Sequence, residues 1–240
     1  MPPENPKKQE PQRPREREEE KEQRSPPRKE EKEAQEVVGR SLATAGITQD
    51  LVKKATTKCA QKIEAKTSKE LEQVNPELAA VIKGVAKHFK MSAALLCATF
   101  HHESRFKHGS IGDPNLPGKS EGIGHFREDA WYDLMNGQAK EFKEFRQFIE
   151  KFYPGKKFNR GENLLADIAA TAAYLKYCGG KKTNFNKLPE YRIIFLRARY
   201  ITGSKETATA QMQLYIDQEF NQVSPKLREF LDTYKRFKTS

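Results

Sequence analysis

Residues 75–106 read NPELAAVIKGVAKHFKMSAALLCATFHHESRF, and this stretch decides the fold. Asn75 is a favourable N-cap, and Pro76 suits the first position of a helix. Apolar residues then recur with helical spacing over 78–89, which predicts an amphipathic helix. Ser92 can cap a second helix. Because that helix is apolar on nearly every side, we expect it to be buried at the centre of a domain.

A carboxylate, Glu103, stands at the end of this second helix. A charge beside a core is costly unless it is paired, exposed or protonated. Two interpretations follow. Either the helix reaches the surface at its C-terminal end and the carboxylate is solvated, or apolar surroundings raise the pKa of Glu103 so that it can donate a proton.

Helical patterns resume after a segment rich in glycine. Residues 107–124 contain five glycines and two prolines, which predicts a long loop or a small hairpin. The alternation of apolar and polar residues that marks a β-strand is absent. Further helices are expected over residues 127–134, 141–152, 162–180, 188–201 and 224–237. The predicted fold class is therefore mainly α-helical.

Local signals mark the ends of these later helices. Asn163 is a suitable N-cap, and the glycine pair at 179–180 suits a C-terminal stop. Pro189 and Pro225 each suit the first helical position. One face of the helix over 141–152 is apolar and is expected to be buried, and it carries Phe142, Phe145, Ile149 and Phe152.

Composition divides the chain into three segments. Residues 1–36 consist almost entirely of Pro, Glu, Lys, Arg and Gln and include seven of the 13 prolines, so we expect them to be disordered. Residues 37–72 have sparse apolar positions that predict one or two amphipathic helices, which either pack on the domain or serve as a connector. Residues 73–240 form the predicted helical domain.

The basic charge belongs to the folded part of the chain. Residues 1–36 carry 10 Lys or Arg and 11 Asp or Glu, whereas the rest carries 34 and 22, a net charge of +12. Such a charge fits a polyanionic partner: a nucleic acid, an anionic membrane surface or an acidic cell-wall polymer. No apolar run is long enough to span a bilayer, and the N-terminus has no apolar segment typical of a signal peptide.

The cysteines predict neither a disulfide framework nor a zinc cassette. The sequence has an odd number of cysteines, and these three are widely spaced: Cys59, Cys97 and Cys178. Cys97 and Cys178 stand in apolar helical patterns, so we expect them to be small core residues.

A helical zinc site of the His-Glu-x-x-His type is not completed. His102 and Glu103 are followed by Phe106 where the second histidine should stand. The adjacent His101 and His102 point to different faces of a helix and cannot easily chelate one ion together. His108 and His125 remain as less favoured ligands, and we expect no metal and no cofactor.

Other chemical classes also lack their motifs. The Gly-x-Ser-x-Gly turn of many serine hydrolases is absent, and Cys97 lies within an apolar helix. The glycine-rich run at 122–126 lacks the Lys-Ser/Thr of a phosphate-binding loop. Aromatic residues near the basic ones are spaced as core residues, so we expect no nucleic-acid partner.

Four elements of the sequence, in order, resemble one enzyme family. The chain is similar to soluble-type lytic transglycosylases and the related goose-type lysozymes over residues 76 to about 215. The motifs that carry the resemblance are VAKHFKMSAALLCATF with HHESRF at 85–106, EGIGHFREDAW at 121–131, NLLADIAATAAYLKY at 163–177 and RARYITGS at 197–204.

The resemblance implies a lysozyme-like helical domain and assigns roles to particular residues. Glu103 would be the general acid and then the base, and Ser104 would support the turn behind it. The other implied substrate-binding residues are Gly122, Ile123, Gly124, His125 and Phe126, which would line the cleft, and Tyr174 and Tyr200, which would face the sugar. His125 replaces the family's usual Gln and Ile201 its usual Asn.

The implied reaction is cleavage of the MurNAc–GlcNAc β-1,4 bond of peptidoglycan at the cell envelope, with 1,6-anhydro products. One carboxylate suffices for it, whereas a hydrolase needs a second one to orient water, and Asp113 and Glu121 are the nearby candidates. The alternatives are a hydrolytic lysozyme and a non-catalytic protein that binds cell wall or nucleic acid. No signal peptide is visible, which delivery with a virion, delivery by a secretion machine or a start that omits a signal peptide would each explain.

Overall fold

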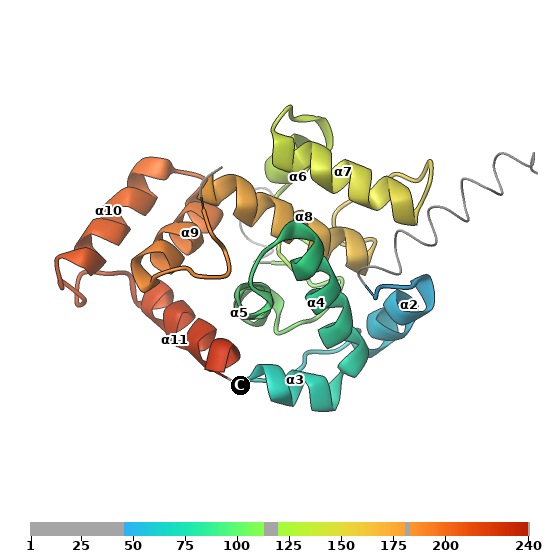
Figure 1. Ribbon diagram of the computed structural model, residues 1–240, viewed down its shortest axis with the longest axis horizontal. Helices are drawn as coiled ribbons and strands as arrows, with labels where there is room; N and C mark the ends of the chain where they lie inside the picture. The colour runs from blue at the N-terminus through green and yellow to red at the C-terminus, as the bar shows by residue number, and fades with distance from the viewer. Residues whose placement is uncertain (1–45, 113–119, 181–182, 240) are drawn as a thin grey trace, which may run out of the picture.

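The computed structural model describes residues 46–112, 120–180 and 183–239 (Figure 1). The predicted tail at 1–36 and Asp113 lie outside them, as do residues 37–45 of the second segment. The described residues form the helices α2 (Gln49–Lys58), α3 (Ser68–Val74), α4 (Pro76–Phe89), α5 (Ala93–Ser104), α6 (Glu128–Asn136), α7 (Lys140–Phe152), α8 (Leu164–Gly179), α9 (Glu190–Thr202), α10 (Lys205–Ile216) and α11 (Pro225–Thr239). The prediction of a mainly α-helical fold is confirmed.

The glycine-rich segment contains a small antiparallel pairing. The backbone nitrogen of Gly112 donates to the oxygen of Ser120 at 2.7 Å, and that of Gly122 donates to the oxygen of Ser110 at 3.0 Å. Glu121 then forms a further antiparallel bridge with Phe126. Of the two forms expected for this segment, the described part adopts the small hairpin.

Several predicted helix ends are found in the structure. Asn75 caps α4 by accepting a hydrogen bond from the nitrogen of Leu78 at 3.0 Å, and Asn163 caps α8 in the same way. Helix α8 ends at the glycine pair, and Pro225 is the first residue of α11.

Two predictions at helix starts need correction. Pro189 is the N-cap of α9, because its ψ of 158° is extended and the helix begins one residue later. Ser92 occupies the N-cap of α5 as expected, but its side chain makes no capping hydrogen bond.

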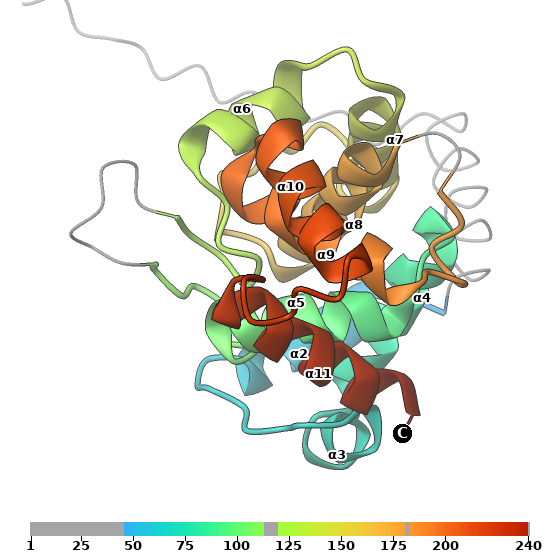
Figure 2. The same cartoon turned by 90° about the vertical axis from the view of Figure 1, so that its left-hand side faces the viewer.

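Helix α5 lies in the middle of the molecule, between α4, α8 and α11 (Figures 1 and 2). Leu95, Leu96, Ala98 and Phe100 are completely buried. The second helix of the opening stretch is therefore the central one, as its uniformly apolar sequence predicts.

The apolar face of α7 is buried as predicted. Phe142, Phe145, Ile149 and Phe152 are all in the core. Helix α7 packs mainly on α8, whose residues are buried on nearly every side.

The three cysteines are free and buried, so the prediction that Cys97 and Cys178 are core residues is confirmed. Burial raises the pKa of each thiol to about 12.

Residues 46–72 pack on the domain. Ile47, Val52, Ala55 and Leu71 belong to the same core as the later helices, and Gln49 donates from Nε2 to the backbone oxygen of Phe152 at 2.9 Å. Of the two possibilities for this segment, the described part shows packing.

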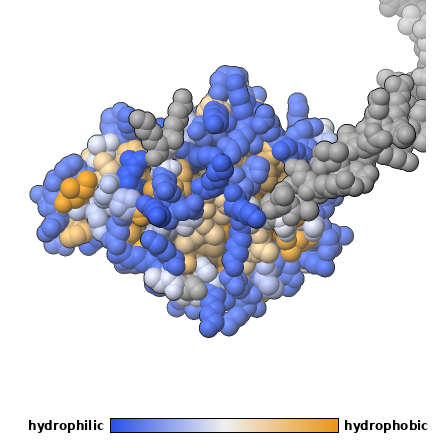
Figure 3. Space-filling model, in the orientation of Figure 1, coloured by the Kyte–Doolittle hydropathy of each residue, from blue (hydrophilic) through white to orange (hydrophobic). Residues whose placement is uncertain are grey.

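Hydrophilic side chains cover much of the face seen in Figure 3, with apolar ones exposed between them. None of the helices in the described ranges is both long enough and apolar enough to cross a membrane.

Replacing Asn75 by alanine tests the N-cap on which α4 depends. Asn75 is fully buried, caps Leu78 and also donates to the sulfur of Cys59 at 3.4 Å. We expect Asn75→Ala to lower the free energy of unfolding by about 1–2 kcal/mol in urea titrations. The control Asn136→Ala removes an exposed amide and should change it by less than about 0.5 kcal/mol. Equal effects of the two changes would contradict the assignment.

Candidate active site

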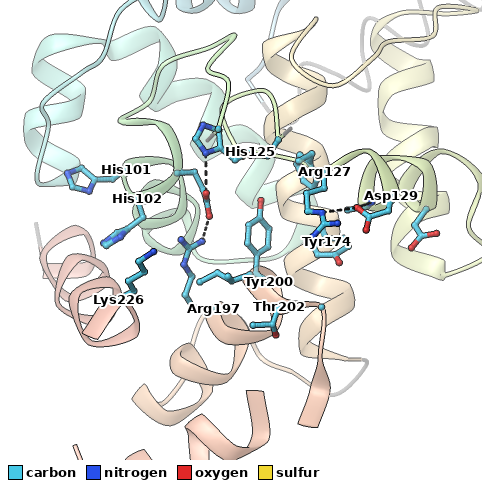
Figure 4. A pocket seen from close by; sticks show the side chains of 18 of the residues that line it. His101, His102, His125, Arg127, Asp129, Tyr174, Arg197, Tyr200, Thr202 and Lys226 are labelled. Atoms are coloured by element: carbon cyan, nitrogen blue, oxygen red, sulfur yellow. Dashed lines mark hydrogen bonds and ion pairs between the residues drawn. The ribbon is translucent and has the colours of Figure 1, made fainter. Parts of the chain in front are cut away.

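Glu103 lies on the last turn of α5, at a cleft of about 740 Å³. The cleft is lined by the ends of α5 and α9, by α6 and the segment that leads into it, by one residue of α8 and by two residues of α11 (Figure 4). Its lining includes Glu103, His125, Phe126, Tyr174 and Tyr200, so five residues of the predicted site meet in one place. Ile201 also lines it and is 48% exposed.

The remaining predicted residues lie behind the wall of the cleft. Ser104 and the segment Gly122–Gly124 are buried. Ser104 donates from Oγ to the backbone oxygen of Ile123 at 2.9 Å, and Tyr200 donates from its hydroxyl to that of Gly124 at 2.7 Å. Ser104 is therefore hydrogen-bonded to the segment that carries His125.

Both glycines of this segment are required by the close approach of α8. A Cβ atom on Gly122 would collide with the carboxylate of Asp167, and one on Gly124 would collide with the hydroxyl of Thr171. Gly122 also has a φ of +84°, which side chains rarely adopt.

Asp167 is a buried polar residue that the sequence did not single out. It accepts a hydrogen bond from the nitrogen of Gly161 at 3.0 Å, and its Oδ2 lies 3.6 Å from Nδ1 of His108. Burial raises the pKa of Asp167. His108, considered above as a metal ligand, therefore faces this carboxylate.

The carboxylate of Glu103 is held between two nitrogen-bearing side chains. Arg197 donates from Nη1 to Oε1 at 2.5 Å, and Nδ1 of His125 lies 3.4 Å from Oε2, as the dashed lines in Figure 4 show. Burial alone raises the pKa of Glu103, but Arg197 and His125 together outweigh it and hold that pKa below its usual value. The side chain is 17% exposed.

Neither interpretation of Glu103 from the sequence is correct as stated. The carboxylate is not simply solvated, and the expectation that apolar surroundings keep it protonated is wrong. It is paired with a cation that lies 94 positions later in the chain.

Arg197 was not predicted as a site residue. Its side chain is only 8% exposed, and its guanidinium carbon lies 4.8 Å from the ring centre of Phe230 and 5.7 Å from that of Tyr200. Its Nε is buried and has no hydrogen-bond partner among the described residues. Within an apolar helical pattern, nothing in the sequence distinguishes this arginine from its neighbour Arg199.

Three aromatic rings form one wall of the cleft. The ring of Phe126 meets those of Tyr174 and Tyr200 edge to face, with centres 6.0 and 6.2 Å apart. Burial raises the pKa of Tyr174 to about 12. Both tyrosines therefore pack against their neighbours and also border the cleft.

Of the two carboxylates expected near Glu103, Asp113 lies outside the described residues and Glu121 does not line the cleft. Glu121 lies 3.6 Å from Arg160 and borders a neighbouring pocket. Asp129, Asp133 and Glu229 line the cleft itself. Within the part of the chain that the structure describes, no group of three or more His, Cys, Asp or Glu side chains could hold a metal ion.

The ion pair predicts that Glu103→Gln destabilises the protein. The substitution leaves Arg197 as a buried charge without its carboxylate, which costs about 3–5 kcal/mol in comparable sites. The double variant Glu103→Gln/Arg197→Met removes both charges and should regain most of the lost stability in chemical denaturation. Glu72→Gln, which breaks the exposed pair with Lys83, is the control and should have a much smaller effect. Equal stability of the single and double variants would contradict the coupling.

The lowered pKa of Glu103 also predicts a loss of stability in acid. The ionised carboxylate contributes fully above its unfolded pKa of about 4.5, and this contribution disappears as the pH falls through the lower folded-state pKa. We expect the stability difference between wild type and Glu103→Gln/Arg197→Met to change below pH 4.5, with the wild type losing more. Parallel unfolding curves across this range would count against the ion pair.

The chain matches no protein-family model, no curated protein and no solved structure. No relative therefore supplies a function for it, and the functional argument depends on the residues and geometry of the cleft.

Proposed function

We propose that this protein is a lytic transglycosylase that cleaves the glycan strands of peptidoglycan at the cell envelope. The proposal is supported by one observation above all. Four elements that are far apart in the sequence, and that resemble the family in order, bring Glu103, His125, Tyr174 and Tyr200 to a single cleft.

The described lining of the cleft holds four cationic side chains, an aromatic wall and the four carboxylates of Glu103, Asp129, Asp133 and Glu229. Arg105, Arg127, Arg197 and Lys226 all line it. Cationic side chains attract the carboxylates of the peptide stems, and the aromatic wall offers apolar surface to sugar rings.

In this reaction Glu103 would donate a proton to the glycosidic oxygen. A carboxylate paired with Arg197 cannot do so, so Glu103 must first leave the guanidinium and take up a proton. This requirement favours activity at acid pH or after substrate has displaced the ion pair. A hydroxyl of the sugar would then attack intramolecularly, because a tethered nucleophile has a high effective concentration.

A non-catalytic glycan-binding protein is the second candidate. The ion pair between Glu103 and Arg197 favours it, since the pair holds the carboxylate in the form that donates no proton. A hydrolytic lysozyme is a third outcome, in which Asp129, Asp133 or Glu229 would orient a water molecule.

Digestion of purified sacculi distinguishes these functions. For a lytic transglycosylase, mass spectrometry of the soluble fragments at a series of acid to neutral pH values should detect 1,6-anhydro-muropeptides, each one water lighter than the hydrolytic product. The variant Glu103→Gln/Arg197→Met should be folded and slower by about 10²–10⁴-fold, the usual contribution of a general acid.

Glu72→Gln/Lys83→Met is the matched control, because it removes an exposed ion pair outside the cleft and should leave the digestion unchanged. Reducing-end products would establish a hydrolase instead. Binding to sacculi without soluble products at any pH would establish the non-catalytic function.

A further inference from the structure

The carboxylate of Glu103 also stands at one end of a row of three polar side chains. Oγ of Ser110 lies 3.0 Å from Nε2 of His125, and Nδ1 of the same ring lies 3.4 Å from Oε2 of Glu103. Each ring nitrogen of His125 thus faces a different partner, the hydroxyl on one side and the carboxylate on the other.

This is the order of groups that activates a serine nucleophile. The imidazole accepts the hydroxyl proton at Nε2, and a carboxylate at Nδ1 fixes its tautomer and stabilises the imidazolium that forms. We propose that Ser110, His125 and Glu103 form an acyl-transfer site that takes small carboxylic esters. This activity goes beyond glycan cleavage and does not depend on it.

Backbone hydrogen bonds fix the positions of Ser110 and His125 relative to each other. The oxygen of Ser110 accepts from the nitrogen of Gly122 at 3.0 Å, and the oxygen of Gly122 accepts from the nitrogen of His125 at 3.2 Å. His125 has a φ of +50°, a conformation that non-glycine residues adopt rarely and that is found at sites where the surrounding structure imposes it. The ring is therefore held where it meets Ser110.

The negative charge on Glu103 suits its place beside His125 in this row of three polar side chains. An orienting carboxylate must be ionised, and Arg197 keeps Glu103 ionised by lowering its pKa against the effect of burial. The ion pair that hinders glycan cleavage thus supports the acyl-transfer site.

A substrate can reach the site. Ser110 is partly exposed and follows the exposed Gly109, and no atom of the described residues lies within 4 Å of a Cβ built on that glycine. His125 is 15% exposed and lines the cleft.

The reaction is balanced by these groups, the ester and water. Ser110 Oγ attacks the carbonyl carbon while its proton passes to His125 Nε2. The bond from that carbon to the alcohol oxygen breaks, and His125 returns the proton to the departing alcohol. Water then attacks the acyl-serine in the same way, which releases the carboxylic acid and restores the Ser110 hydroxyl.

Covalent labelling of the full chain tests the site. Diisopropyl fluorophosphate should add once to the folded protein, and peptide mapping should place the adduct on Ser110. Hydrolysis of p-nitrophenyl acetate should fall by at least about 100-fold in Ser110→Ala and in His125→Gln, whose amide cannot accept the proton. The control Ser120→Ala alters a serine that lines the cleft, and this variant should label and hydrolyse as the wild type does.

Circular dichroism should show that the variants are folded, since Ser110 is a small, partly exposed loop residue. An adduct at any other residue, no adduct on the folded protein, or equal hydrolysis by wild type and Ser110→Ala would overturn the proposal. Neither probe contains a sugar, so these outcomes are independent of whether the protein cleaves peptidoglycan.

Discussion

The ion pair between Glu103 and Arg197 is the interaction on which the cleft depends. It joins the end of the central helix α5 to α9, and both side chains are largely withdrawn from water. Each charge is tolerable there only because the other is present, since an uncompensated buried charge is strongly unfavourable. The rings of Phe230 and Tyr200 also lie against the guanidinium. The same pair also sets the charge state of the carboxylate and so decides which chemistry it can perform.

The wall of the cleft is built by polar contacts from three helices to one glycine-containing segment. Ser104 of α5, Asp167 of α8 and Tyr200 of α9 all lie against residues 122–124. Glycines at 122 and 124 allow this approach because a side chain at either position would collide with α8. His125 therefore follows a segment that is anchored on several sides, and its position is a property of the whole domain.

Sequence reasoning predicts most of the helices, but not α10, and part of the site, and it fails where contacts join distant segments. The N-caps Asn75 and Asn163 and the burial of α5 follow from short-range rules of capping and periodicity. The prediction that Glu103 and the aromatic residues share one site depended on the resemblance of their motifs to those of a known family. Arg197 and Asp167 were missed because each stands in an apolar helical pattern, and their roles arise only from tertiary packing.

Burial of the three thiols has a practical consequence for studying this protein. Only the thiolate reacts with oxidants and alkylating reagents, and with a pKa of about 12 its fraction at neutral pH is on the order of 1 in 10⁵. The native chain should therefore form no intermolecular disulfides in air and need no reductant. A single cysteine introduced on the surface could be modified selectively, so fluorophores or spin labels can be attached on either side of the cleft without removing a native cysteine.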